Sequence, residues 1–342
     1  MSVWLVRAGK AGENDGYCLE SSQSVIGWEE IGNLSSAVEW ADFVNFVDAA
    51  YPGLKRATIT NYAGQLYAFA HRIQIGDLIC LPLKTTKMIA IGRVVSDYKF
   101  SPEAPPNQRH GRKVEWLRTD VARAAIKQDL LYSLGAFMTV CEIKRNDAQW
   151  RIDEIVKTGI DPGSRAAVNI APDAENVDTE IEAVDLVETA SDRIRQFISE
   201  EFAGHALAQL TAAVLTAEGF NCIVSPEGPD GGIDILAGRG PLGLDSPRLL
   251  VQVKSGTASI DAPTVRQLHG VISTHGADQG LLVAWGGLNR VAAKELATQR
   301  FNLRVWDAND LIESVYKNYS VLPASITARL PLRQIWVLEE EA

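Results

Sequence analysis

The chain has 342 residues and a formal net charge of −10, from 33 basic and 43 acidic side chains. This length predicts two domains with a connector. No apolar run approaches the roughly 20 residues of a membrane span and the first residues lack a signal-peptide core, which excludes a membrane protein and predicts a cytoplasmic one.

The acidic excess lies mainly in one segment. Residues 172–202 carry 10 acidic and 2 basic side chains, whereas residues 1–171 and 203–338 are close to neutral. The net charge therefore does not exclude a basic DNA-binding groove elsewhere. We interpret the acidic segment as a connector, and its occupation of such a groove as an autoinhibitor is a hypothesis. The four cysteines form no CxxC pair, which predicts neither disulfides nor a zinc site.

Short strands with turn residues between them dominate the first 160 residues. The strands are predicted at 3–9, 26–34, 77–83, 87–100, 113–118 and 136–143, and amphipathic helices at 37–51 and 58–73. This mixture predicts a barrel-like, curled sheet flanked by helices. Residues 161–192 combine Pro, Ala and dense acid without an aromatic residue, which is typical of a linker, with a short helix at 179–188.

The order of elements changes after residue 193. A long helical pattern at 193–220 is followed by strands at 221–226, around Asp234 and around Gln252, then by alternating helices and strands up to residue 319. Antiparallel strands followed by parallel ones predict an α/β fold with a mixed sheet between helices.

Polar side chains interrupt two apolar runs of this second half. Asp234 lies within GGIDILAG, and Gln252 and Lys254 lie within RLLVQVKSG. Side chains alternate along a strand, so Gln252 and Lys254 share one face, and the connection GRGPLGLDSP would bring Asp234 beside them. A buried charge is costly unless it is paired or binds a metal.

The chemistry of these groups fits phosphodiester hydrolysis. A hard cation such as Mg²⁺, or Mn²⁺ in its place, is held by carboxylate and carbonyl oxygens and keeps several waters. Such an ion offsets developing charge and activates a bound water, while a lysine orients that water or the phosphate. Gly231 and Gly232 would let a DNA backbone approach.

With Asp234 in a GGID context and Gln252-Val253-Lys254, residues 195–320 resemble the Mrr-like branch of the PD-(D/E)xK nucleases. The resemblance implies that Asp234 and Gln252 hold the metal, that the Val253 carbonyl adds a ligand, and that Lys254 serves the attacking water. Many members place a glutamate on the first helix, but the matching position here is close to Ala208.

Other side chains are helper candidates for the missing glutamate. His205 and Gln209 lie at suitable places on the predicted helix, although a locally satisfied histidine is the favoured interpretation of His205. Asp230, in the GPDGG turn, is favoured as a turn former over a second metal ligand. Asp234 as a plain turn residue, or paired with Lys254 in a structural ion pair, stays an alternative.

The first half carries a weaker resemblance. The segments VWLVRAG, IGW, IGDLICLPL, AIGRVVSDYKF and RHGRKVEW, over residues 1–150, resemble PUA-like domains of the EVE type. This resemblance implies a module that flips a modified base into an aromatic pocket. The predicted pocket residues are Trp28, Tyr98, Phe100 and Trp116. The predicted contacts with the DNA backbone are Arg109, His110, Arg112 and Lys113. For Trp116, a place in the barrel core is the favoured alternative.

These features predict a metal-dependent DNA endonuclease of the modification-dependent, type IV-like class that acts on foreign, phage-type DNA. Its predicted parts are a reader domain at 1–160, an acidic linker at 161–192, a nuclease domain at 193–325 and a tail at 326–342. Double-strand cleavage needs two sites, which predicts a homodimer or a DNA-induced oligomer on double-stranded DNA. The alternatives are a nuclease effector that senses a nucleotide or a protein, and a non-catalytic DNA-binding protein.

Overall fold

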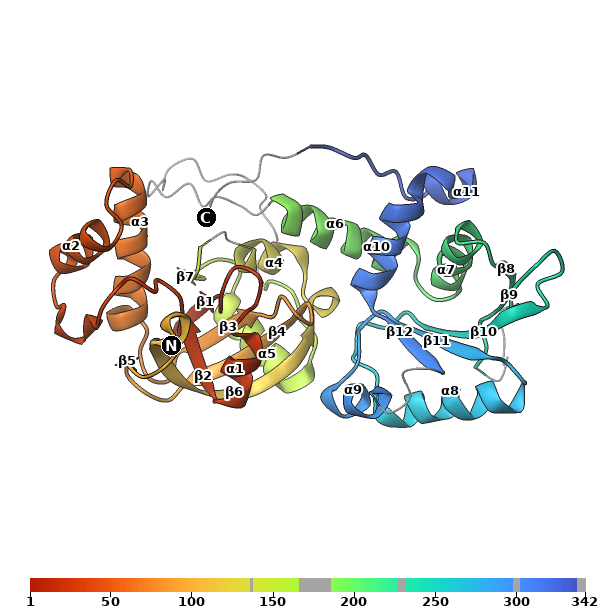
Figure 1. The fold of residues 1–342 in the computed structure, drawn as a ribbon, viewed down its shortest axis with the longest axis horizontal. Helices are drawn as coiled ribbons and strands as arrows, with labels where there is room; N and C mark the ends of the chain where they lie inside the picture. Colours follow the sequence, from red (N-terminus) through yellow and green to blue (C-terminus); the bar gives the residue numbers. More distant parts are fainter. Residues whose placement is uncertain (136–137, 166–185, 227–231, 298–301, 337–342) are drawn as a thin grey trace. The chain divides into compact units, whose positions relative to one another are not determined.

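The computed structural model describes residues 1–135, 138–165, 186–226, 232–297 and 302–336. It divides into two compact units, residues 1–193 and 194–342, called here the N-terminal and C-terminal units (Figure 1). Within the described residues, no helix is both long and apolar enough to cross a membrane.

One mixed sheet organises the N-terminal unit. Its strands are β1 (Val3–Val6), β2 (Gln23–Ile26), β3 (Leu78–Pro82), β4 (Met88–Val94), β5 (Lys99–Phe100), β6 (His110–Ala122) and β7 (Val140–Glu142). The strand order is β2-β6-β4-β3-β1-β7, and β5 pairs with β6. Among the described residues no ladder joins β2 to β7, so the sheet is open. The predicted strand at 26–34 is wrong, because β2 ends at Ile26 and an irregular segment with a 3₁₀ turn, Leu34–Ser36, follows it.

Helices cover both faces of this sheet. They are α1 (Asp15–Glu20), α2 (Trp40–Ala50), α3 (Arg56–Tyr67), α4 (Gln128–Leu134) and α5 (Ala148–Thr158). Alternation along β1 sends Trp4 and Val6 into the core with α2 and α3, and Val3 and Leu5 into the core with α4 and α5. A curled sheet flanked by helices is thus the observed arrangement, although α1, α4 and α5 were not predicted.

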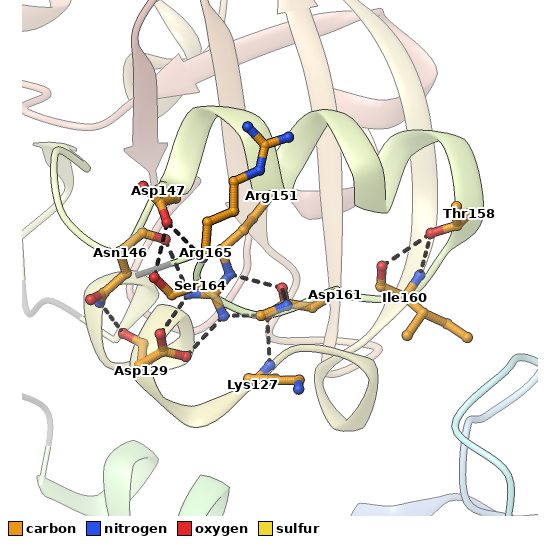
Figure 2. A network of polar contacts seen from close by, with 11 residues as sticks. Lys127, Asp129, Asn146, Asp147, Arg151, Thr158, Ile160, Asp161, Ser164 and Arg165 are labelled. Carbon is orange, nitrogen blue, oxygen red and sulfur yellow. Dashed lines mark hydrogen bonds and ion pairs between the residues drawn. The ribbon is translucent and has the colours of Figure 1, made fainter. Parts of the chain in front are cut away.

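A buried ion-pair network closes the end of this unit (Figure 2). The Arg151 guanidinium donates to Asp161 and Asp129, with Nε–Oδ1 of Asp161 and Nη2–Oδ1 of Asp129 both at 2.8 Å. The backbone N–H of Lys127 also donates to Asp161. Burial opposes the charged form of Asp161, but these hydrogen bonds prevail and lower its pKa. Asp161 therefore packs in the N-terminal unit, although its segment was predicted to begin the linker.

The C-terminal unit is built on a second mixed sheet. Its strands are β8 (Asn221–Val224), β9 (Ile235–Arg239), β10 (Asp245–Lys254), β11 (Gln279–Ala284) and β12 (Leu303–Trp306). The strand order is β12-β11-β10-β9-β8. Pairing is antiparallel between β8, β9 and β10 and parallel between β10, β11 and β12, as the sequence predicts.

Helices also lie on both faces of the second sheet. They are α7 (His205–Ala217), α8 (Ala262–Thr274), α9 (Arg290–Leu296), α10 (Ala308–Asn318) and α11 (Ala324–Thr327). Figure 1 shows α7 and α10 on one face and α8 and α9 on the other. The single helix predicted over 193–220 is wrong. Two helices, α6 (Leu186–Glu201) and α7, are separated at Gly204, which has a φ of +62°.

A buried polar relay in the N-terminal unit fixes the protonation state of His110. His110 Nε2 lies 3.1 Å from the Ile31 carbonyl and Nδ1 lies 2.8 Å from the Tyr98 hydroxyl. A carbonyl only accepts, so Nε2 carries a proton, and in the neutral ring Nδ1 accepts from the Tyr98 hydroxyl. The Tyr98 hydroxyl in turn accepts from the Leu34 N–H. The relay ties β6 to the segment after β2.

This relay predicts a pH-dependent stability. Burial, aided by the charge of Arg109, lowers the pKa of His110 despite the bond to Ile31. Since the pKa of an unfolded histidine is about 6.5, the contribution of His110 to the free energy of unfolding is complete above that pH and declines as the pH falls below it. Denaturant titrations at several pH values between 5 and 7 should show His110→Gln losing part of this pH dependence.

The matched control is His275→Gln, because His275 is exposed at the end of α8. It should keep the pH dependence of the wild-type protein. An unchanged pH profile in His110→Gln would contradict the assignment of a neutral, buried imidazole.

Candidate active site

The pairing of β9 with β10 places Asp234 next to Gln252. Val251 and Ile235 are register partners in this antiparallel ladder, and both are fully buried. Asp234 immediately precedes β9. Its backbone N–H donates to the Val251 carbonyl at 2.9 Å, so Asp234 is bonded to β10 just outside the regular ladder.

The Asp234 carboxylate is oriented by the backbone of β10. Its Oδ2 accepts a hydrogen bond from the Val253 N–H at 2.7 Å. In an extended strand the N–H and C=O of one residue project to the same side, so the Val253 carbonyl also faces the β9 side of β10. The carboxylate and this carbonyl therefore share one edge.

Gln252 presents a buried and unsatisfied oxygen. Its side chain is 4% exposed, and within the described residues its Oε1 has no hydrogen-bond partner. A buried acceptor without a partner is costly and calls for an explanation such as a bound ion or water. It lies on the same face of β10 as Leu250, which packs in the core beneath α8.

Gly232 makes room for this amide. It has a φ of +87°, and a Cβ added at this position would lie 2.8 Å from Gln252 Nε2. A side chain at residue 232 would therefore displace the Gln252 amide as well as strain the backbone.

Lys254 ends β10 on the face that also carries Gln252. Its backbone carbonyl accepts the N–H of Trp285, at 2.9 Å. In the part of the chain that the structure describes, its ammonium makes no hydrogen bond or ion pair. The alternative of a structural ion pair between Asp234 and Lys254 receives no support from this geometry.

The donor set fits a hard divalent cation. No group of three or more His, Cys, Asp or Glu side chains that could hold a metal occurs among the described residues. Among the described residues, the oxygens at the site are those of the Asp234 carboxylate, Gln252 Oε1 and the Val253 carbonyl. One carboxylate with neutral oxygens and water suits Mg²⁺ or Mn²⁺ better than zinc, which favours sulfur and imidazole.

The helper residues differ in their positions. His205 begins α7 beside Gly204, whose N–H donates to the Ser255 hydroxyl at 3.1 Å, so the start of α7 lies close to the end of β10. Gln209 is exposed one turn further along α7, and no described contact joins it to Asp234. Ala208 is buried. Asp230 lies outside the described residues.

Sequence reasoning missed two residues that contact the site. Ser225 bonds the main chain on both sides of the Asp234 α-carbon, and Trp285, which is 2% exposed, bonds the Lys254 carbonyl. Neither lies in the motif, and both come close only through strand pairing. The Gly231-Gly232 pair was predicted to let a DNA backbone approach; Gly232 instead makes room for the Gln252 amide, and Gly231 lies outside the described residues.

The predicted base-pocket residues do not form one group. Tyr98 and Phe100 both lie against His110, with ring centroids 6.0 and 5.2 Å from it. Trp28, with a φ of +63°, packs edge-on against Tyr62 of α3 instead. The Trp116 indole donates to the Cys18 carbonyl at 2.9 Å and packs with the core around α1, as the core alternative predicts.

Two of the four predicted phosphate contacts are interior residues. Arg112 is 2% exposed and donates to the carbonyls of Phe69 and Ala70 in the turn that ends α3, at 2.7 and 2.8 Å. Burial lowers the pKa of Arg112 to about 10. His110 is also fully buried. The side chains of Arg112 and His110 bond to internal carbonyls and are not available to phosphates. The predicted phosphate contacts that remain are Arg109, which is half-buried, and Lys113, which is exposed.

Comparison with known proteins assigns families to parts of both units. Residues 199–315 match the model of the Mrr catalytic domain, described as "Restriction endonuclease". Residues 4–143 match a domain of unknown function, so the resemblance to PUA-like EVE modules stays a prediction. No curated protein matches the chain.

Three solved structures show weak similarity. A protein of unknown function, AF1548, is 20% identical, covers 33% of this chain and 65% of its own length, and has a TM-score of 0.25. The MspJI restriction endonuclease, in complex with a 27-mer oligonucleotide, is 18% identical. The match covers 75% of this chain and 64% of that structure's chain, with a TM-score of 0.32. The DNA modification-dependent restriction endonuclease AspBHI is 13% identical. The match covers 82% of this chain and 76% of that structure's chain, with a TM-score of 0.33.

At these identities and TM-scores the three structures establish no activity for this chain, which spans about 65% of the first two. The family match over 199–315 is independent of them. It covers Asp234, Gln252 and Lys254 together with the sheet that carries them. The C-terminal unit of this protein therefore contains a restriction endonuclease domain of the Mrr catalytic family.

Proposed function

We propose that this protein is a DNA endonuclease that depends on a divalent metal and selects DNA carrying a modified base through its N-terminal unit. The proposal rests on three groups near the end of β10: Asp234, which is bonded to the Val253 N–H, and the Gln252 oxygen and Lys254 ammonium, for which the described residues offer no partner. A buried structural core gains nothing from such a set, whereas phosphodiester hydrolysis uses each member.

Each side chain has a separate role in this proposal. Asp234, Gln252 and the Val253 carbonyl would hold a divalent cation, Mg²⁺ or Mn²⁺ in this proposal. The bound ion would supply charge stabilisation at the scissile phosphate and a more acidic water. Lys254 orients the attacking water and offsets phosphate charge. Because its ammonium has no protein partner in the described residues, it is available to the substrate without breaking an internal contact.

We propose that the N-terminal unit recognises the modified base, and its half-buried aromatic residues support this proposal. Trp28 and Tyr98 are half-buried, and in this proposal a flipped base stacks on their rings. Phe100 lies next to Tyr98 across His110. Arg109 and Lys113 flank His110 and supply positive charge for phosphates. One site cuts one strand, so we propose that two copies act on double-stranded DNA.

Lys254→Ala is expected to lower the rate of DNA cleavage by about 100-fold or more, as for loss of a group that stabilises developing charge. DNA binding, measured by fluorescence anisotropy in Ca²⁺, should stay within about threefold of wild type, because metal ligation is intact. Lys317→Ala is the control, since Lys317 is an exposed lysine on α10. Equal cleavage by both variants would overturn the proposed role of Lys254, whereas DNA binding without cleavage by the wild-type protein in any divalent metal would favour the non-catalytic alternative.

Supercoiled plasmids that carry 5-methylcytosine, 5-hydroxymethylcytosine or no modification test the reader proposal. In Mg²⁺ or Mn²⁺, cleavage of at least one modified plasmid should exceed that of the unmodified plasmid by about tenfold, and chelation with EDTA should abolish it. Equal cleavage of all three would remove the reader proposal and leave the nuclease. A quiescent enzyme that cuts only after addition of a nucleotide would favour the sensing alternative.

Gly232→Ala is expected to reduce cleavage more than backbone strain alone explains, because the added Cβ displaces the Gln252 amide. Gly276→Ala is the matched control: Gly276 also has a positive φ, of +61°, but a Cβ there would meet nothing within 4 Å. Both variants bear a similar conformational penalty of about 1 kcal/mol. Equal cleavage rates and equal metal affinity in the two variants would contradict the proposed role of Gln252.

A further inference from the structure

Asp234 lies just outside the regular ladder, so hydrogen bonds other than those of the ladder must fix its position. The β8–β9 ladder pairs Val224 with Ile235 as its last residues, and Asp234 precedes that pair. Ser225, the first residue after β8, continues the contact. Its N–H donates to the Asp234 carbonyl at 2.8 Å and its hydroxyl donates to the Ile233 carbonyl at 2.6 Å.

The peptide group that precedes the Asp234 α-carbon is hydrogen-bonded at both of its ends. That group consists of the Ile233 carbonyl and the Asp234 N–H. The carbonyl accepts from the Ser225 hydroxyl on the β8 side, and the N–H donates to the Val251 carbonyl on the β10 side. A peptide plane bonded at both ends cannot rotate freely, so the direction of the Asp234 Cα–Cβ bond is set by its neighbours.

The direction of this bond decides where the carboxylate lies. Asp234 has only two side-chain torsions, and one of its oxygens is already placed on the Val253 N–H. A small tilt of the peptide plane would draw the carboxylate away from Gln252 and the Val253 carbonyl. Ligand sets work only when held to within about 0.5 Å of the productive geometry.

We propose that Ser225 is a positioning residue, which sets the Asp234 carboxylate for cation binding through the Ile233–Asp234 peptide group. The inference rests on the proposed function and adds to it a residue outside the Asp/Gln/Lys motif. The hydroxyl is the essential part, since the backbone N–H of Ser225 persists in every variant.

Ser225→Ala and Ser225→Thr test this proposal in the full-length protein. Calorimetric titration with Mn²⁺ in the absence of DNA should show about tenfold weaker binding for Ser225→Ala, the effect of one lost hydrogen bond. In cleavage assays kcat should fall with little change in KM for DNA. Ser225→Thr retains the hydroxyl and should restore both quantities to within about threefold of wild type.

Thr216→Ala is the matched control. The Thr216 hydroxyl donates to the Ala212 carbonyl at 2.7 Å within α7, and this bond is partly buried like that of Ser225. Its loss should leave Mn²⁺ affinity and kcat unchanged. Thermal unfolding of all three variants separates a local effect from general destabilisation.

The outcomes distinguish the two proposals. An active wild-type enzyme with unchanged Mn²⁺ affinity and kcat in Ser225→Ala would overturn the role of Ser225 and leave the nuclease intact. A loss that Ser225→Thr does not restore, or that Thr216→Ala shares, would make the hydroxyl merely structural and also overturn it. A wild-type protein that neither binds Mn²⁺ nor cuts any plasmid would overturn the proposed function itself.

Discussion

The register of β9 against β10 is the constraint on which the candidate site depends. Ile235 and Val251 meet as partners, and both are fully buried between the sheet and its helices. A slip of one residue would put the side chains of Ile235 and Val251 on opposite faces of the sheet and would separate Asp234 from Gln252 in the same way. The burial of the apolar pair therefore fixes the place of the polar pair, Asp234 and Gln252, next to it.

The same strand pairing explains how an unfavourable buried polar group, the Gln252 amide, is tolerated on β10. An unsatisfied amide oxygen in Gln252 is unfavourable by itself, yet the strand that carries it is stabilised by Leu250, Val251 and the parallel pairing with β11. The surrounding core offsets this unfavourable contribution.

The N-terminal unit uses buried polar groups for a different purpose. Arg112 and His110 hold the turn after α3 and the segment after β2 against β6 through backbone carbonyls. Arg151 closes the other end through Asp129 and Asp161. These side chains fix irregular segments that have no ladder of their own, and the aromatic residues near them are placed as a consequence.

The sequence by itself determined the mixed sheet of the C-terminal unit, the hairpin between Asp234 and Gln252 and their common edge, because strand alternation and local turns are encoded within a few residues. It also determined the restriction endonuclease resemblance. Only the tertiary structure decided that Arg112 and His110 are internal, that α6 and α7 are separate helices, and that Ser225 and Gly232 border the site. Burial and long-range pairing depend on which segments meet, and local periodicity carries no information about partners distant in the chain.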